Sequence, residues 1–224
     1  MKHSSSKLRS NRKNFIILPM VFFVLGYLII YIAAWPIIKP LMSFGNMVFL
    51  NENYNHNKQI QVLTSRNSIV PDSGIINLSN IQFPAYGDLF AHLKIDNVGV
   101  DADLYFGDGT SQLNSGLGLY NGSFIPGYGK TSLIAGHNNT YFNGLKNISI
   151  GDTVDISTNY GNYSYVVSDT KIFNNDYSNA YDLSADYENL ILYTCYPFDT
   201  LGLTKSRLFV YCKYVSGPDI ILDK

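Results

Sequence analysis

An uncharged apolar run near the N-terminus constrains this chain more than any other feature. From Phe15 to Ile38 there are 24 residues without a single Asp, Glu, Lys or Arg. As a helix rising about 1.5 Å per residue, the run can cross a hydrocarbon core of roughly 30 Å. Pro19 falls in its first turn and Pro36 near its end, where a helix tolerates proline. We therefore expect one N-terminal transmembrane helix over residues 15–38.

The charges on either side of the run predict its orientation. The positive-inside rule places residues 1–14 in the cytoplasm and the rest of the chain outside. A cleaved signal peptide is the alternative, but its apolar region is usually only about 7–15 residues long, and no small-x-small cleavage site follows this run. We therefore expect an uncleaved, single-pass anchor in the cell membrane. Only Lys39 separates the run from the first acid, Glu52, whereas five cations and no acid precede it: Lys2, Lys7, Arg9, Arg12 and Lys13.

The part of the chain beyond the anchor is acidic. All 17 acids lie at or beyond Glu52, against ten of the 16 Lys and Arg residues, so this part carries a net charge of about −7. A nucleic-acid partner would need a basic face, and the charge balance argues against one. With 224 residues, the chain has room for one sizeable domain and an appendage.

The composition of the chain changes near residue 86. Residues 39–85 are rich in Asn, Ser and Gln, which predicts a solvated extracellular stalk. Over residues 86–224, short apolar stretches alternate with Gly, Asn, Asp and Pro. This pattern predicts a mainly β domain, a closed antiparallel β-barrel of about eight strands with short helices near 110–114 and 140–147. The candidate strands are Asp88–Ile95, Val98–Tyr105, Thr131–Ala135, Thr153–Thr158, Tyr163–Ile172, Leu190–Thr194 and Arg207–Tyr214.

Two successive strands carry the residues with the clearest chemistry. The first strand ends in Thr194-Cys195 and is stopped by Pro197, and the second begins at Arg207. Arg207 thus begins its strand beside the end of the strand that carries Cys195. A cation at this place favours the reactive thiolate, and a guanidinium also binds the oxyanion that forms from a peptide carbonyl. Cys195 is therefore the candidate nucleophile and Arg207 the candidate transition-state stabiliser.

The second cysteine raises the alternative of a disulfide, since two cysteines outside the cell often pair. Alternation puts Cys212 together with Leu208 and Val210, on the strand face opposite Arg207. Cys212 is also five residues, about 17 Å, from Arg207, whereas disulfide Cα atoms lie within roughly 7 Å of each other. We therefore expect Cys212 to be a core residue rather than a partner of Cys195.

His137 is the candidate acid–base partner of the thiol. It follows an apolar strand and Gly136, so its side chain leaves the strand end at the barrel rim and can reach a neighbouring rim residue. Taken alone, such a histidine is more often an ordinary hydrogen-bonded loop residue. The remaining histidines are weaker candidates because they lie in the cytoplasmic tail, in the stalk and inside a strand: His3, His56 and His92.

At these residues the chain resembles the sortases, surface transpeptidases of Gram-positive bacteria. The nucleophile motif of that family is TLxTC, and residues 191–195 keep four matching positions, with Ile191 in place of the first Thr. Residues 135–137, Ala-Gly-His, match the motif around the family's catalytic His, and Arg207 matches its Arg on the following strand. The resemblance covers about residues 86–214. Within the family the chain is most similar to class D, with class B as the alternative.

The resemblance implies a sortase-like barrel and a mechanism. Cys195 would attack the Thr carbonyl of an LPxTG-like sorting signal, with His137 as acid and base and Arg207 stabilising the oxyanion. The resulting thioester would pass to an amine, implied to come from a cell-wall precursor, and so anchor surface proteins that carry a C-terminal sorting signal. No metal or cofactor is implied. The same motif implies three substrate contacts: Ile191, Thr194 and Tyr196. For Tyr196, packing is the alternative role.

Three other functions fit parts of the pattern. A sortase that polymerises pilins would accept a lysine amine, although the stalk has no Asp-Pro-aromatic lid motif of the class C kind. A hydrolytic cysteine protease would cleave its substrate with no gain from added amine. A non-enzymatic surface β-barrel, a binding module, would lose stability but not function when Cys195 is replaced.

Overall fold

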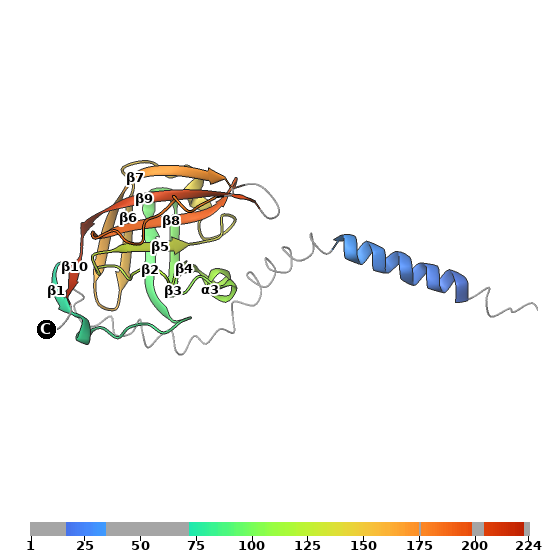
Figure 1. Ribbon diagram of the computed structural model, residues 1–224, viewed down its shortest axis with the longest axis horizontal. Coiled ribbons are helices and arrows are strands. Elements are labelled where there is room, and N and C mark those ends of the chain that lie inside the picture. Colours follow the sequence, from blue (N-terminus) through green and yellow to red (C-terminus); the bar gives the residue numbers. More distant parts are fainter. Residues whose placement is uncertain (1–16, 35–71, 175, 199–203, 222–224) are drawn as a thin grey trace, which may run out of the picture. The chain divides into compact units, whose positions relative to one another are not determined.

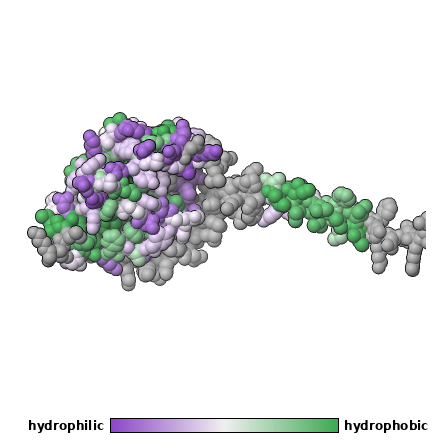
Figure 2. Space-filling view, in the orientation of Figure 1, coloured by the Kyte–Doolittle hydropathy of each residue, from purple (hydrophilic) through white to green (hydrophobic). Residues whose placement is uncertain are grey.

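The chain divides into two units, and the described residues of the first form one helix, which Figure 1 shows in blue. The computed structural model describes residues 17–34, 72–174, 176–198 and 204–221. Helix Ile17–Ala34 is long and apolar enough to cross a membrane, by length and composition. Its visible surface is hydrophobic along almost its whole length (Figure 2). The predicted apolar segment that could anchor the chain is thereby confirmed. Most of the predicted stalk lies outside the described residues.

The second unit is a closed barrel of eight strands, which run in the order β2-β3-β4-β5-β8-β9-β7-β6 (Figure 1). The barrel closes where β6 pairs with β2. Its strands are β2 (Leu89–Ile95), β3 (Val100–Phe106), β4 (Leu117–Leu119), β5 (Thr131–Ala135), β6 (Thr153–Thr158), β7 (Asn162–Asn174), β8 (Asn189–Tyr196) and β9 (Ser206–Ser216). The closed, mainly β barrel predicted from the sequence is thereby confirmed.

Two of the eight strand pairings are parallel, β3 with β4 and β5 with β8. The other six are antiparallel. A parallel pair needs a crossover connection, because the chain must return to the same end of the sheet. Helix α3 (Thr110–Ser115) lies in the first crossover, and residues 136–188, which include β6 and β7, form the second.

The barrel interior is filled by the inward side chains of alternating strand residues. In β6, for example, Val154 and Ile156 are fully buried while Asp155 between them is exposed. Strand β5 is buried at all five positions. The connection from β7 to β8 explains this, since Ala180 packs with Leu133 on the outer side of the sheet. Strand β5 therefore lies beneath a second layer, which the sequence pattern alone did not predict.

A half-buried carboxylate fixes the start of β8. Glu188 accepts hydrogen bonds from the backbone N–H groups of Gly127 (3.1 Å) and Gly129 (2.8 Å) and from the Tyr165 hydroxyl (2.6 Å). Burial raises the pKa of Glu188, and these hydrogen bonds oppose that shift. The loop before β5 and the start of β8 are thus held together at one end of the barrel.

Short elements complete the described chain. Strand β1 (Gly74–Asn77) pairs in parallel with β10 (Pro218–Ile221), and Ile81 is buried against the barrel core. Strand β1 and Ile81 lie within the range predicted to be stalk. The helix predicted near 140–147 is a 3₁₀ helix, η4 (Asn143–Asn147). Two further 3₁₀ helices are η2 (Leu78–Asn80) and η3 (Asp96–Val98).

Candidate active site

Antiparallel pairing brings Cys195 and Arg207 together. The register of β8 and β9 places these two residues directly opposite each other. Both side chains belong to the outer face of the sheet, with Tyr193 and Phe209 as the preceding pair on the same face. Directly opposite residues have Cβ atoms about 4.5–5.5 Å apart. The nucleophile and the guanidinium predicted from the sequence are therefore neighbours in the fold.

The two cysteines lie in different environments, and both thiols are free. Cys195 is half-buried at the end of β8. Cys212 is buried in the interior core and pairs with Leu190, five residues before Cys195. Burial raises the pKa of Cys212 to about 12, so this thiol stays protonated. The predicted core position of Cys212 is confirmed.

His137 leaves the barrel at the same end as Cys195. Strand β5 runs parallel to β8, and Ala135 pairs with Tyr193. His137 lies two residues beyond Ala135, and Cys195 lies two residues beyond Tyr193. If the register continues, His137 and Cys195 therefore lie side by side at the same end of the barrel. The three sequence candidates thus come from three adjacent strands, β5, β8 and β9, in the order His137, Cys195 and Arg207.

Two hydrogen bonds tie the strand end before His137 to the strand end that carries the nucleophile. The buried Thr194 hydroxyl donates to the Gly136 carbonyl at 2.7 Å. Beyond the histidine, the Asn138 side-chain amide donates to the Pro197 carbonyl at 3.0 Å. The separation of the two strand ends is therefore set on both sides of His137.

The environment of His137 favours its neutral form. The ring is half-buried, and burial lowers its pKa below the usual value of 6.5. Desolvation disfavours the imidazolium, which carries the charge. A neutral imidazole can accept a proton from a neighbouring thiol, which is the role that a general base requires.

Contacts from two connections surround the Arg207 guanidinium. Its Nη1 donates to the carbonyl of Thr204 (2.7 Å), just before β9, and to that of Ser206 (2.9 Å), the first residue of β9. On the other side, the guanidinium carbon lies 5.6 Å from the centre of the Tyr177 ring, which belongs to the β7–β8 connection. Arg207 is thus held between the β7–β8 connection and the residues that lead into β9.

The three residues implied as substrate contacts do not share one face. Ile191 lies on the outer face, four residues before Cys195, and is buried in a cluster with Ala180. Thr194 and Tyr196 lie at the alternate positions of the strand, whose side chains belong to its inner face. Tyr196 packs against the interior core. The structure therefore places Ile191 on the face that carries the nucleophile and turns Thr194 and Tyr196 away from it.

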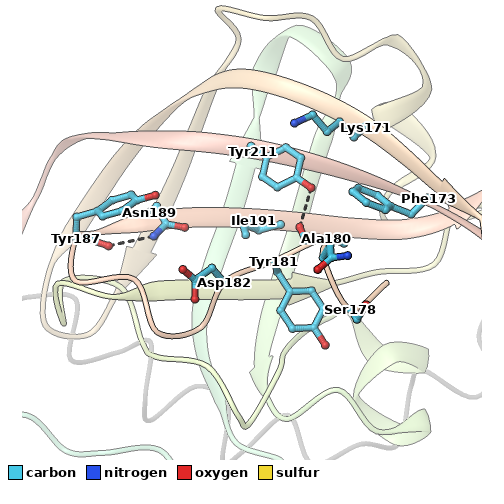
Figure 3. A pocket seen from close by; sticks show the side chains of 11 residues that line it. Lys171, Phe173, Ser178, Ala180, Tyr181, Asp182, Tyr187, Asn189, Ile191 and Tyr211 are labelled. Carbon is cyan, nitrogen blue, oxygen red and sulfur yellow. Dashed lines mark hydrogen bonds between the residues drawn. The ribbon is translucent and has the colours of Figure 1, made fainter. Parts of the chain in front are cut away.

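A surface pocket of about 510 Å³ adjoins Ile191 (Figure 3). Its walls come from β7, β8, β9 and the β7–β8 connection, and Tyr211 crosses it to donate a hydrogen bond to the Ala180 carbonyl at 2.7 Å. Its lining mixes aromatic and aliphatic side chains with polar and charged ones. The lining includes Lys171, Phe173, Tyr181 and Asp182.

Sequence reasoning missed several residues that shape this region. Asp108, after β3, accepts a hydrogen bond from the Tyr193 hydroxyl at 3.2 Å. Tyr177 and Asn138 make the contacts described above. The position of Asn138 directly after His137 was a usable signal, whereas Asp108 and Tyr177 lie in polar connections without any distinguishing pattern. Asp199 and Thr200, which follow the nucleophile motif, lie outside the described residues.

His92 on β2 has partners of its own. Its Nδ1 lies 3.0 Å from Asp103 and its Nε2 lies 2.6 Å from Asp101. The hydrogen bond with Asp103, followed by the one with Asp101, raises the His92 pKa against the effect of burial. Across the part of the chain that the structure describes, no group of three or more His, Cys, Asp or Glu residues is arranged to hold a metal ion.

Comparison with known proteins identifies the family. The family model of the sortase domain matches residues 93–215, more than half of the chain. Sortase D of Bacillus subtilis (strain 168) is 29% identical over 133 residues, which cover 59% of this chain and 67% of that protein.

Solved structures show the same fold. A sortase D5 transpeptidase of Clostridium perfringens aligns with a TM-score of 0.54 and 19% identity, over 73% of this chain and 90% of that one. A lid mutant of sortase A from Corynebacterium diphtheriae aligns with a TM-score of 0.51 and 26% identity, over 58% and 72%. Together with the domain match and the closed eight-stranded barrel, these similarities show that the chain belongs to the sortase family of transpeptidases.

Proposed function

We propose that this chain is a membrane-anchored cysteine transpeptidase with Cys195 as nucleophile, His137 as acid and base, and Arg207 as oxyanion stabiliser. The observation that carries the proposal is the direct pairing of Cys195 with Arg207 on β8 and β9, with His137 at the end of the adjacent β5. The substrate is an LPxTG-like sorting signal at the C-terminus of a surface protein. The chain is most similar to class D.

In the first half-reaction, His137 takes the proton of the Cys195 thiol, and the thiolate attacks the carbonyl carbon of the signal Thr. The new carbon–sulfur bond pushes the carbonyl electron pair onto oxygen, and Arg207 binds this oxyanion. A guanidinium has five N–H donors, so contacts to backbone carbonyls leave it capacity to bind another oxygen. As the tetrahedral intermediate collapses, the peptide C–N bond breaks and His137 returns its proton to the departing amine.

In the second half-reaction, an amine attacks the thioester and restores an amide. The carbon–sulfur bond breaks, and the proton lost by the amine passes through His137 to the Cys195 thiolate. The acceptor amine comes from a cell-wall precursor. The reaction exchanges one amide for another, so these steps need neither a metal nor a redox cofactor.

The pocket beside Ile191 suits the part of the signal before the scissile bond. Ile191 stands four residues from Cys195, about 13 Å along an extended strand. An extended peptide of similar length therefore reaches from the thiol to the pocket. The aromatic walls offer apolar surface for the first residues of the signal.

The apolar helix fits this chemistry. With residues 1–14 in the cytoplasm and residues 15–38 as the anchor, the stalk that begins at residue 39 would hold the catalytic domain outside the cell, and β1 and Ile81, at the end of the predicted stalk range, pack with that domain. Enzyme and membrane-tethered substrate would then share one surface. Such confinement raises their effective concentration without any new contact.

A peptide cleavage assay tests this function. The full chain in detergent is mixed with a library of quenched LPxTG-like peptides, with and without triglycine. We expect cleavage and, with triglycine, a ligated product identified by mass spectrometry. Cys195→Ala should abolish both. His137→Ala should lower the rate by about 10²–10⁴-fold and Arg207→Ala by about 10²–10³-fold, as for other acid–base and oxyanion groups.

Cys212→Ala is the matched control, since it removes the other thiol from a site in the barrel interior. We expect this variant to keep its activity. A folded wild-type chain that cleaves no peptide in the library would contradict the proposed substrate class. Cleavage that yields only hydrolysed product at every triglycine concentration would instead favour a hydrolytic protease.

A further inference from the structure

We propose that Tyr177 is a positioning residue that holds the Arg207 guanidinium in its catalytic place. The proposal rests on the proposed function, since it assumes that Arg207 stabilises the oxyanion. Tyr177 lies in the β7–β8 connection, 30 residues before Arg207 in the sequence. Nothing in the nucleophile or histidine motifs points to it. Its role follows from what its ring and its hydroxyl each contact.

The Tyr177 ring faces the cation. The Arg207 guanidinium carbon lies 5.6 Å from the ring centre, within the range of a cation–π contact. The same ring packs against Phe209, two residues further along the outer face of β9, at 6.2 Å between centroids. Tyr177 is half-buried in this position. Contact with the strand thus fixes the ring, and the ring in turn limits where the guanidinium can go.

The Tyr177 hydroxyl reaches the other connection. It donates a hydrogen bond to the Lys205 carbonyl, in the segment just before β9. Arg207 itself donates to the carbonyls on either side, those of Thr204 and Ser206. Tyr177 and Arg207 therefore bridge the β7–β8 and β8–β9 connections beside the end of β8, where Cys195 lies.

An arginine needs such support because its side chain is long and flexible. Ordering it costs conformational entropy, and an oxyanion contributes only when the donors already point to where charge develops. The aromatic face restricts the guanidinium without using its N–H donors. Loss of the ring should therefore weaken transition-state stabilisation more than substrate binding. We expect kcat to fall while KM changes little.

The experiment compares Tyr177→Leu, Tyr177→Phe and the wild-type full chain in the peptide cleavage assay. We expect Tyr177→Leu to lower kcat by about tenfold with KM changed by less than about twofold, because the cation–π contact is lost. Tyr177→Phe keeps the ring and should stay within about threefold of wild type, having lost only the hydroxyl contact. Tyr177→Gln provides a second non-aromatic variant if the Leu variant unfolds.

A double-mutant cycle separates positioning from a purely structural role. In an Arg207→Ala background, Tyr177→Leu should cause no further loss of kcat, since residues that act as a unit are not additive. Leu183→Ala is the structural control: Leu183 packs in the same outer cluster, on the same connection, and does not line the pocket. We expect this control to change kcat by less than about twofold.

The outcomes are distinguishable. Equal kcat losses from Tyr177→Leu in both backgrounds, or equal losses from Tyr177→Leu and Leu183→Ala, would overturn the positioning role while leaving the transpeptidase function intact. Failure of Tyr177→Phe to rescue the rate would do the same. If Arg207→Ala kept the full wild-type kcat, the proposed role of Arg207 would fail, and the role of Tyr177 would fail with it.

Discussion

At the residue scale, the hydroxyl of Thr194 links the strand of the nucleophile to the strand of the histidine. It is buried next to Cys195 and donates to the Gly136 carbonyl at 2.7 Å, immediately before His137. Its side chain points away from the face that carries Cys195. We therefore assign Thr194 to the support of the site rather than to direct contact with substrate.

Replacing Thr194 by Val tests this assignment. Val keeps the shape and leaves the Gly136 carbonyl without its partner, so the free energy of unfolding should fall by about 1–2 kcal/mol. Because the spacing of the two strand ends relaxes, kcat should also fall, while Thr194→Ser should keep both quantities close to wild type. Urea unfolding and the peptide assay measure them. A Val variant with unchanged stability and rate would show that the hydrogen bond has no such role.

Some of the site could be predicted residue by residue. Alternation along a strand is local, and it correctly placed Arg207 beside Cys195 and Cys212 in the core. The partners of Thr194 and Tyr177 could not be predicted in this way. These contacts join segments that are far apart in sequence, and their geometry depends on how strands and connections lie against each other.

At the scale of elements, the β2–β3 pair carries a pH-sensitive contact. The hydrogen bond with Asp103, followed by that with Asp101, raises the pKa of His92 in the folded chain. A raised pKa means that the folded state binds the proton more tightly than the unfolded state. The resulting stabilisation is fully present below the unfolded value of about 6.5 and is lost as the pH rises through the folded value.

His92→Gln should therefore destabilise the protein at about pH 5.5 and have little effect near pH 9. The difference in unfolding free energy should stay below about 1 kcal/mol, because the partners are partly exposed and screened by solvent. Urea unfolding of both proteins at the two pH values measures it, and comparison with wild type cancels the titration of all other groups. A difference of equal size at both pH values would show that the interaction does not depend on the imidazolium.

Strand existence was easier to predict than strand order. The first half of the long strand β7 alternates clearly, whereas the three residues of β4 and the four of β1 are too few to show a period. The two parallel pairings could not be predicted, because sequence periodicity does not report which strands become neighbours. The second layer over β5 was missed for the same reason.

At the scale of the whole molecule, the chain joins an apolar helix to a barrel that carries its polar chemistry on the outside. The helix was predictable because an uncharged apolar run of this length is typical of membrane-spanning segments and is longer than most buried helices need. The family could be predicted because three short motifs occur in the expected order. Each unit has a separate task in the proposed reaction, anchoring for one and acyl transfer for the other.

The central claim is that Cys195 carries the acyl group between two amides. The most direct test is intact-mass spectrometry of the full chain after rapid mixing with a cleavable sorting-signal peptide, with triglycine added in a second step. We predict that the mass of the chain increases by the mass of the acyl fragment, and that digestion of the chain locates the adduct on the fragment that contains Cys195. The adduct should be absent in Cys195→Ala and should be discharged faster as the triglycine concentration increases. Peptide cleavage without any adduct at Cys195, or an adduct located on Cys212, would contradict this claim.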